Sequence, residues 1–245
     1  MTRPPGSGDT GAGNGVKIVA AIANEAPADA VERLLASLRG GGAAAIAVCA
    51  ADVTRRPPAF RALVEAWGER AREALAAQRD AARAGWLRAW SVDEAQPLAL
   101  PRSPRPGEAA PGVRLITLCR RRRGLTRAQF AEAWRGEHWR IALSFTIPPR
   151  GYAQDVVTGS LWPPDDVDGI ACLHFASYAE FDARFDDHPE EAARGLADAE
   201  RFLDLERSET SFAIETLHEP CAAAAPRAAP GEGHRHRPLA DGRRR

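Results

Sequence analysis

The amino-acid sequence predicts an α+β protein built from two similar halves. Runs of β-branched and apolar residues alternate with amphipathic helical patterns, and in the second half their order is strand, helix, strand, strand, helix, strand. The same order can be laid, more faintly, over the first half. Segments rich in Pro, Gly, Ala and Arg flank and separate the halves. We expect these segments not to fold, because they bury too little apolar surface to offset the entropy of ordering them.

We therefore expect five segments along the chain of 245 residues. A disordered N-terminus would lead into a degenerate first half, a Pro-rich linker would join it to the second half, and a disordered tail would follow. The corresponding boundaries are 1–15, 16–95, 96–112, 113–219 and 220–245. Each half lies in the lower part of the usual range of domain sizes.

In the first half the apolar patterns predict four strands and two helices. The helix that begins at Pro27 has the clearest pattern, with Val31, Leu34, Leu35 and Leu38 on one face. Residues 59–84 allow two interpretations, a strand followed by a helix or a single long helix, because their Ala, Arg and Glu content favours helix. With the first interpretation the strands fall at 16–23, 44–50, 59–67 and 86–92, and the second helix at 69–84.

The second half begins with the apolar strand 113–119. Thr126 and Gln129 form a capping-box pattern that starts a helix, and the stretch up to His138 reads as that helix. Ser177 and Glu180 predict a second capping box, and Pro189 suits the first turn of a further helix. The remaining strands are expected at 152–157, 169–175 and 210–216.

These elements predict two ferredoxin-like βαββαβ halves, each a four-stranded antiparallel sheet with both helices on one face. A sheet that is covered on one face must bury the other, and packing the two open faces together achieves this. The result would be a pseudo-dimeric α/β barrel with a cavity between the sheets. It could form within the chain, as an intrachain pseudo-dimer, or in a homodimer.

The second half resembles the EthD family of the dimeric α/β barrel superfamily. The resemblance is strongest over 113–219 and is carried by the stretches LCRRRRGLTRAQFAEAWRGEH, RGYAQDVV, DVDGIACLHFASYAEFDARF and LADAERFLDLERSETSFAIE. It implies a ferredoxin-like barrel around a small-molecule pocket. It also implies a place in the oxidative degradation of organic compounds, or in the dehydration or decarboxylation of aromatic polyketides.

We expect His138, Tyr152 and His174 to be catalytic, because two imidazoles and a phenol can move protons near neutral pH and stabilise a developing enolate. Alternation along 169–175 puts Cys172 and His174 on the face that the cavity would occupy. The resemblance favours the same face for Tyr152 and Gln154. Substrate would then be bound by Gln154, Cys172 and Trp134.

Each of these residues also has a purely structural interpretation. His138 could be an imidazole that ends a helix and interacts with its dipole. His174 could be half-buried in the sheet with a hydrogen-bond partner, and Tyr152 could serve to pack its ring. Cys172 could be a small core residue.

The composition excludes several classes of protein. Thirty-three basic residues balance thirty-three acidic ones, so the chain lacks the basic excess of a nucleic-acid-binding domain. No apolar run has the length of a membrane span, no secretory signal is evident, and four unclustered cysteines read as reduced thiols, so we expect a cytoplasmic protein. Lys17 is the only lysine, and we attribute the excess of arginine to coding composition.

We expect a site without cofactor or metal, because the HExxH motif and paired metal ligands are missing from the sequence. Haem stays an alternative, since the same barrel holds it elsewhere and one histidine could ligate the iron. The predicted protein therefore binds a small hydrophobic or aromatic metabolite and acts by oxidation or by acid/base decarboxylation or dehydration. The alternative is a non-catalytic ligand-binding or assembly protein.

Overall fold

The computed structural model describes residues 16–219, except for 56, 103–104 and 163–164. In this part of the chain, eight strands form one closed barrel in the order β1-β3-β2-β8-β5-β7-β6-β4. The predicted disordered segments, 1–15 and 220–245, lie outside the described residues. No helix of the described residues is long and apolar enough to cross a membrane.

The first half of the barrel contains four strands and three helices. In chain order these are β1 (Lys17–Ile22), α1 (Ala30–Gly40), β2 (Ala45–Ala51), β3 (Ala62–Trp67), α2 (Ala71–Ala76), α3 (Arg79–Arg83) and β4 (Leu87–Leu98). The strand-then-helix interpretation of 59–84 is therefore confirmed and the single long helix is wrong. The predicted helix at 69–84 is divided into α2 and α3.

The second half repeats this arrangement with longer helices. Its elements are β5 (Val113–Cys119), α4 (Arg127–Ala133), the π-helical turn η1 (Trp134–His138), α5 (Trp139–Leu143), β6 (Gly151–Trp162), β7 (Gly169–Phe175), α6 (Tyr178–Asp186), α7 (Pro189–Ala199) and β8 (Glu209–Glu219). The strand order is β4-β1-β3-β2 in the first half and β8-β5-β7-β6 in the second. Both are the order of a ferredoxin-like sheet.

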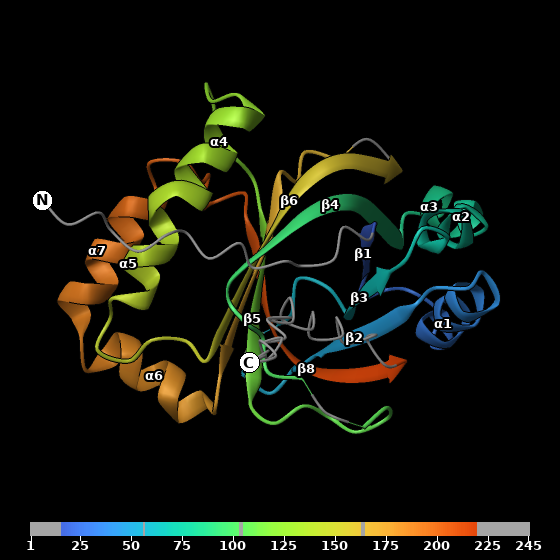
Figure 1. Ribbon diagram of the computed structural model, residues 1–245, viewed down its shortest axis with the longest axis horizontal. Coiled ribbons are helices and arrows are strands. Elements are labelled where there is room, and N and C mark those ends of the chain that lie inside the picture. Colours follow the sequence, from blue (N-terminus) through green and yellow to red (C-terminus); the bar gives the residue numbers. More distant parts are fainter. Residues whose placement is uncertain (1–15, 56, 103–104, 163–164, 220–245) are drawn as a thin grey trace, which may run out of the picture.

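The two sheets are joined edge to edge by antiparallel pairing of β2 with β8 and of β4 with β6. Figure 1 shows the helices α1–α3 on one side of the barrel and α4–α7 on the opposite side. The predicted fold class, two ferredoxin-like halves in a pseudo-dimeric barrel, is confirmed, and the barrel closes within one chain. Because β4 and β6 pair across the halves, both extend beyond their predicted ends, and β4 reaches Leu98 in the expected linker.

Local capping explains where the helices of the second half begin. Thr126 Oγ1 accepts from the Gln129 amide at 3.2 Å, and Gln129 Oε1 accepts from the Thr126 amide at 2.9 Å, which completes the predicted capping box. The second box forms only in part: Ser177 Oγ accepts from the Glu180 amide, whereas the Glu180 carboxylate binds Arg150. Helix α7 begins at Pro189 as predicted.

The helix that begins at the first capping box does not end at His138. It continues through the π turn η1 into α5, as far as Leu143. The interpretation of His138 as a helix-ending residue is therefore wrong. The π turn is an insertion within the helix, and the helical backbone continues beyond it. Single π turns of this kind are frequent at functional sites.

Charged side chains occupy part of the barrel interior, next to an apolar cluster that includes Phe60, Trp90 and Ile116. The ammonium group of Lys17, a residue 2% exposed, is 2.7 Å from Glu65, 2.6 Å from Glu94 and 2.8 Å from Asp155. The only lysine of the chain therefore joins β1, β3, β4 and β6 from inside the barrel.

A second group of charges adjoins the first. The Arg114 guanidinium is 2.6 Å from the Glu215 carboxylate, which is also 2.8 Å from Arg102. With Lys17 there are three cations beside four carboxylates, namely Glu65, Glu94, Asp155 and Glu215. One carboxylate is therefore in excess over the cations. Burial raises the pKa of Asp155 to about 7 despite Lys17, so this carboxyl can take up a proton near neutral pH and remove the excess negative charge.

Removing the Lys17 charge should strongly destabilise the barrel. In Lys17→Met three carboxylates lose their shared cation in a buried site, and we expect the free energy of unfolding to fall by about 3–5 kcal/mol in urea titrations at pH 7. Arg33→Met is the control, because Arg33 pairs with Asp29 on an exposed helix surface and its loss should cost at most about 1 kcal/mol. Equal losses in the two variants would contradict a stabilising role for the interior cluster.

Candidate active site

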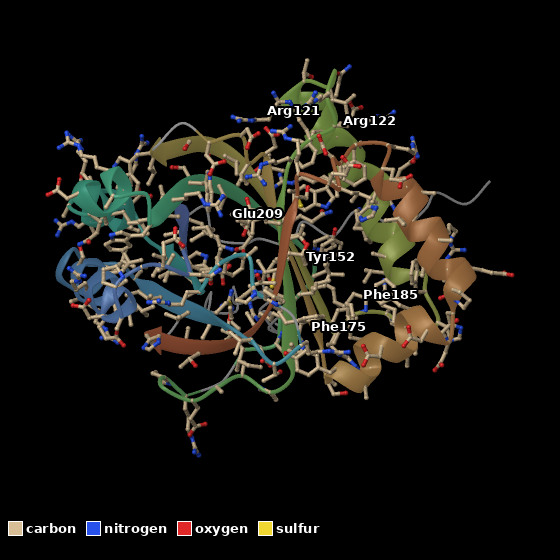
Figure 2. The ribbon with its side chains drawn as sticks, turned by 180° about the vertical axis from the view of Figure 1, so that it is seen from behind. Arg121, Arg122, Tyr152, Phe175, Phe185 and Glu209 are labelled. Atoms are coloured by element: carbon tan, nitrogen blue, oxygen red, sulfur yellow. The ribbon has the colours of Figure 1, made fainter. Side chains whose placement is uncertain are left out.

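An apolar cavity of about 200 Å³ lies between the sheet of the second half and the helices α5, α6 and α7. The sheet supplies Leu115, Leu173 and Phe175, and the helices and the loop after α5 supply His138, Ala142, Phe145, Arg184, Phe185, Ala192, Gly195, Leu196 and Ala199. Figure 2 shows Tyr152, Phe175 and Phe185 in the layer between the sheet and these helices. The cavity is thus outside the barrel and not between the two sheets, where we expected a pocket.

Two large apolar side chains at this cavity are open to solvent. Leu196 is 53% exposed and Phe185 is 37% exposed, so the cavity reaches the surface beside α6 and α7. An apolar cavity of about 150 Å³ is large enough for benzene. The volume here suits a molecule with one aromatic ring.

His138 lines the cavity and is held by a carboxylate. Its Nδ1 lies 2.8 Å from Oδ2 of Asp198, near the end of α7. Because a carboxylate accepts, Nδ1 carries the hydrogen, and the lone pair of the neutral ring is on Nε2. The other Asp198 oxygen accepts from Arg201 at 3.0 Å, and the Phe202 ring packs edge-on against the imidazole, with centroids 5.0 Å apart. This fixed orientation is what a general base requires.

The surroundings of His138 favour the neutral form of its ring. Burial lowers its pKa from the ordinary value of 6.5, and the Arg184 charge lowers it further, whereas the hydrogen bond and charge of Asp198 act in the opposite direction. The neutral form, which can accept a proton, therefore persists to a lower pH than in a free histidine.

Three of the predicted site residues form one buried hydrogen-bonded group. The Tyr152 hydroxyl accepts from Trp134 Nε1 at 2.8 Å and from Gln154 Nε2 at 3.2 Å. Gln154 Nε2 also donates to the Trp134 carbonyl at 3.0 Å. Since Trp134 is the first residue of η1, β6 thereby anchors the turn that carries His138. Tyr152 and Gln154 are each 1% exposed and are not among the residues that line the cavity.

The expected orientation of β6 is wrong. Tyr152 packs with Phe130, Trp134 and Phe202 under the helices, whereas Asp155 points into the barrel toward Lys17. The alternation correctly placed Tyr152 and Gln154 on one face of β6. The other face, which carries Asp155, is the one that points into the barrel. Burial raises the pKa of Tyr152 well above its ordinary value, so its hydroxyl stays protonated.

Cys172 and His174 lie on the other side of the sheet from the cavity. Cys172 points into the barrel, where burial raises the pKa of its thiol to about 11 despite Arg114. His174 Nε2 lies 2.7 Å from the carbonyl of Pro111, and the ring is almost fully buried at the end of β7. The structure therefore joins Trp134, Tyr152 and Gln154 to one another beside the turn that carries His138, and places Cys172 and His174 on the other face of the sheet.

Two groups of side chains have metal-ligand chemistry, and both are in the barrel interior. They are Cys49 with Glu65 and Glu215, and Glu65 with Glu94 and Asp155. Lys17 and Arg114 already bind these carboxylates, so positive side chains of the protein stand where an ion would be. The described residues show no comparable group at the apolar cavity.

Asp198 and Arg184 were not among the predicted site residues. No nearby sequence pattern pointed to Asp198, because its side chain contacts His138 only when α7 packs beside η1. A sequence pattern could have identified Arg184. It follows Phe181 by three residues and precedes Phe185, which places a cation on the apolar face of α6.

Replacing Asp198 should change the titration of His138. In Asp198→Asn the acceptor charge that raises the pKa of His138 is lost, and burial then lowers the pKa further below 6.5. The measurement is an NMR titration of the histidine rings, with His138 assigned from His138→Gln. Glu137→Gln, an exposed neighbour on η1, is the control and should leave the titration unchanged. An unchanged pKa in Asp198→Asn would mean that the two side chains do not interact in solution.

Replacing Tyr152 should affect stability. Tyr152→Phe leaves the buried Nε1 of Trp134 without its acceptor, which should cost about 1–3 kcal/mol of unfolding free energy. In a double-mutant cycle with Trp134→Phe, we expect the two losses to be less than additive, because the second substitution removes the unpaired donor. Strict additivity in urea titrations would rule out this hydrogen bond.

Comparisons with known proteins agree with the fold. Residues 122–206 match the EthD domain family. A solved structure described as an anthrone oxidase-like protein has 11% sequence identity and a TM-score of 0.59, with 87% of this chain and 98% of that chain covered. A variant of chlorite dismutase from Candidatus Nitrospira defluvii has 11% identity and a TM-score of 0.43, with 81% and 91% covered. No curated protein matches the chain.

The TM-score of 0.59 with the anthrone oxidase-like protein establishes a shared fold, and the identity of 11% establishes nothing about substrate. The family match covers η1, β6, β7, α6 and α7, and so contains His138, Arg184 and Asp198. Residues 122–206, in the second half of this chain, are therefore similar to the EthD domain family, and they contribute to an α/β barrel that the first half completes.

Proposed function

We propose that this protein binds a small hydrophobic or aromatic molecule in the apolar cavity and that His138 transfers a proton to or from it. The observation that carries the proposal is the His138–Asp198 pair at the wall of a cavity otherwise lined mostly by apolar side chains. The EthD domain and a neighbour named anthrone oxidase-like support a role in oxidative metabolism, in degradation or in a polyketide-type pathway.

The chemistry that fits is removal of a proton from a carbon next to a carbonyl. The C–H bond breaks, its hydrogen joins Nε2 of His138, and the electron pair moves into the substrate as an enolate. The imidazolium that forms is stabilised by Asp198, as in other histidine–carboxylate pairs. Dehydration begins from such an anion, and so does oxidation when dioxygen is the oxidant.

In this proposal Tyr152, Gln154 and Trp134 are positioning residues. They hold η1 in place and so determine where the imidazole lies. The predicted roles of Cys172 and His174 gain no support, because both face away from the cavity.

The test has a binding part and a chemical part. Single-ring phenols, ketones and acids are screened by thermal shift, where a ligand at a hundred times its Kd should stabilise the protein by about 2.7 kcal/mol. The ligands that bind are then incubated in D2O, and exchange of their acidic C–H is followed by NMR. We expect exchange with the wild type and a loss of about 100-fold or more in His138→Gln, with Glu137→Gln as the unaffected control.

The pH dependence gives a further check on the base. Exchange should fall as the pH drops through the lowered pKa of His138, and in Asp198→Asn this decline should move to still lower pH. Ligand binding without exchange would instead support a non-catalytic carrier or accessory protein. If no compound of these classes binds, the cavity is not a ligand site and the proposal fails.

A further inference from the structure

Arg184 is a buried cation without a carboxylate partner. The residue is 3% exposed, and its Nη2 donates to the Ala142 carbonyl at 2.9 Å while Nη1 donates to the carbonyl of Ile147. Among the described residues no carboxylate forms an ion pair with it. Lys17 and Arg114, which are also buried, each bind at least one carboxylate.

The guanidinium of Arg184 retains unused hydrogen-bonding capacity. It has five N–H donors, two of which reach the carbonyls, and its buried Nε has no partner within the described residues. Glu191 raises the pKa of Arg184, but its own oxygens accept from the amide and hydroxyl of Thr146, at 2.8 and 2.9 Å. Burial nevertheless lowers the pKa of Arg184 to about 10, so the group is charged at neutral pH.

The charge is surrounded by aromatic rings at the cavity. The guanidinium carbon lies 4.0 Å from the centroid of Phe145, 5.8 Å from that of Phe185 and 5.9 Å from that of Phe175. All four residues line the cavity together with His138. Cation–π contacts compensate only a part of what a buried guanidinium loses in leaving water. If the Arg184 side chain served only to hydrogen-bond α6 to two carbonyls, an uncharged donor would do so without the free-energy cost of burying a charge.

We propose that the ligand of this cavity is a single-ring aromatic carboxylate and that Arg184 binds its carboxylate group. This inference rests on the proposed function, because it names the substrate class of the same cavity. A carboxylate matches the planar fork of guanidinium donors and supplies the missing negative charge in a site of low dielectric. Its ring would occupy the apolar space among Leu115, Leu173 and Phe175.

The experiment compares a charged and a neutral ligand of the same shape. Benzoate and benzamide are titrated by calorimetry into the full-length wild type, Arg184→Met and Arg194→Met. We expect the wild type to bind benzoate about tenfold or more tightly than benzamide, because a hydrogen-bonded charge contributes more than a neutral group. In Arg184→Met this ratio should fall to about one, with benzamide affinity retained.

Arg194→Met is the matched control. Arg194 also stacks on Phe145, at 5.6 Å, but it is exposed on α7, so its loss should keep the preference for benzoate. A merely structural role of Arg184 would lower stability in Arg184→Met without changing the ratio of the two affinities.

The outcomes separate this inference from the function on which it rests. If the wild type binds benzamide as tightly as benzoate, Arg184 does not select an anion, although the cavity remains a ligand site. If benzoate is preferred equally by the wild type and Arg184→Met, another group supplies the preference and the assignment is overturned. If neither ligand binds the wild type, the assignment of an aromatic carboxylate is overturned, while the proposed function is decided separately by the screen of phenols and ketones. The wild-type comparison can overturn the proposal even if Arg184→Met does not fold.

Discussion

Each half of this chain forms a four-stranded sheet with helices on only one face, and the open face of each sheet must be covered. Pairing of β2 with β8 and of β4 with β6 meets this requirement by closing the two sheets into one barrel. The lengths of β4 and β6 and the burial of charges inside the barrel follow from this closure. So does the position of the cavity, because the barrel interior is filled by side chains and the remaining space lies under the helices.

The elements that depend on neighbouring residues could be predicted from the sequence. The Thr126 capping box and the Pro189 helix start depend on contacts within one turn. The strands could be predicted from runs or alternation of apolar residues along the chain. What escaped prediction depends on partners far along the chain. β4 and β6 extend because each gives the other a hydrogen-bonding edge, and the π turn at Trp134 is held by Gln154 from another strand.

The orientation of β6 shows the limit of pattern analysis more clearly. A period of two divides a strand into two groups but does not say which group faces which side. The family resemblance favoured the cavity face for Tyr152 and Gln154, yet the barrel interior beside β6 is ionic and contains Asp155 instead. Lys17, to which we assigned no role from the sequence, supplies the positive charge that pairs with Asp155 there. His138 lines a cavity that lies outside the barrel and not between the sheets, and its partner Asp198 is brought to it by the packing of α7.

Closure of the barrel within a single chain also has an evolutionary consequence. When two copies of one chain build such a barrel, each substitution is made twice, and every change in one copy must suit the other. Here the halves are separate stretches of one sequence and can diverge independently. The first half has short α2 and α3 helices packed through alanines, while the second keeps longer helices, a cavity and a histidine–carboxylate pair. A substitution at the cavity of the second half therefore leaves the sequence of the supporting half unchanged.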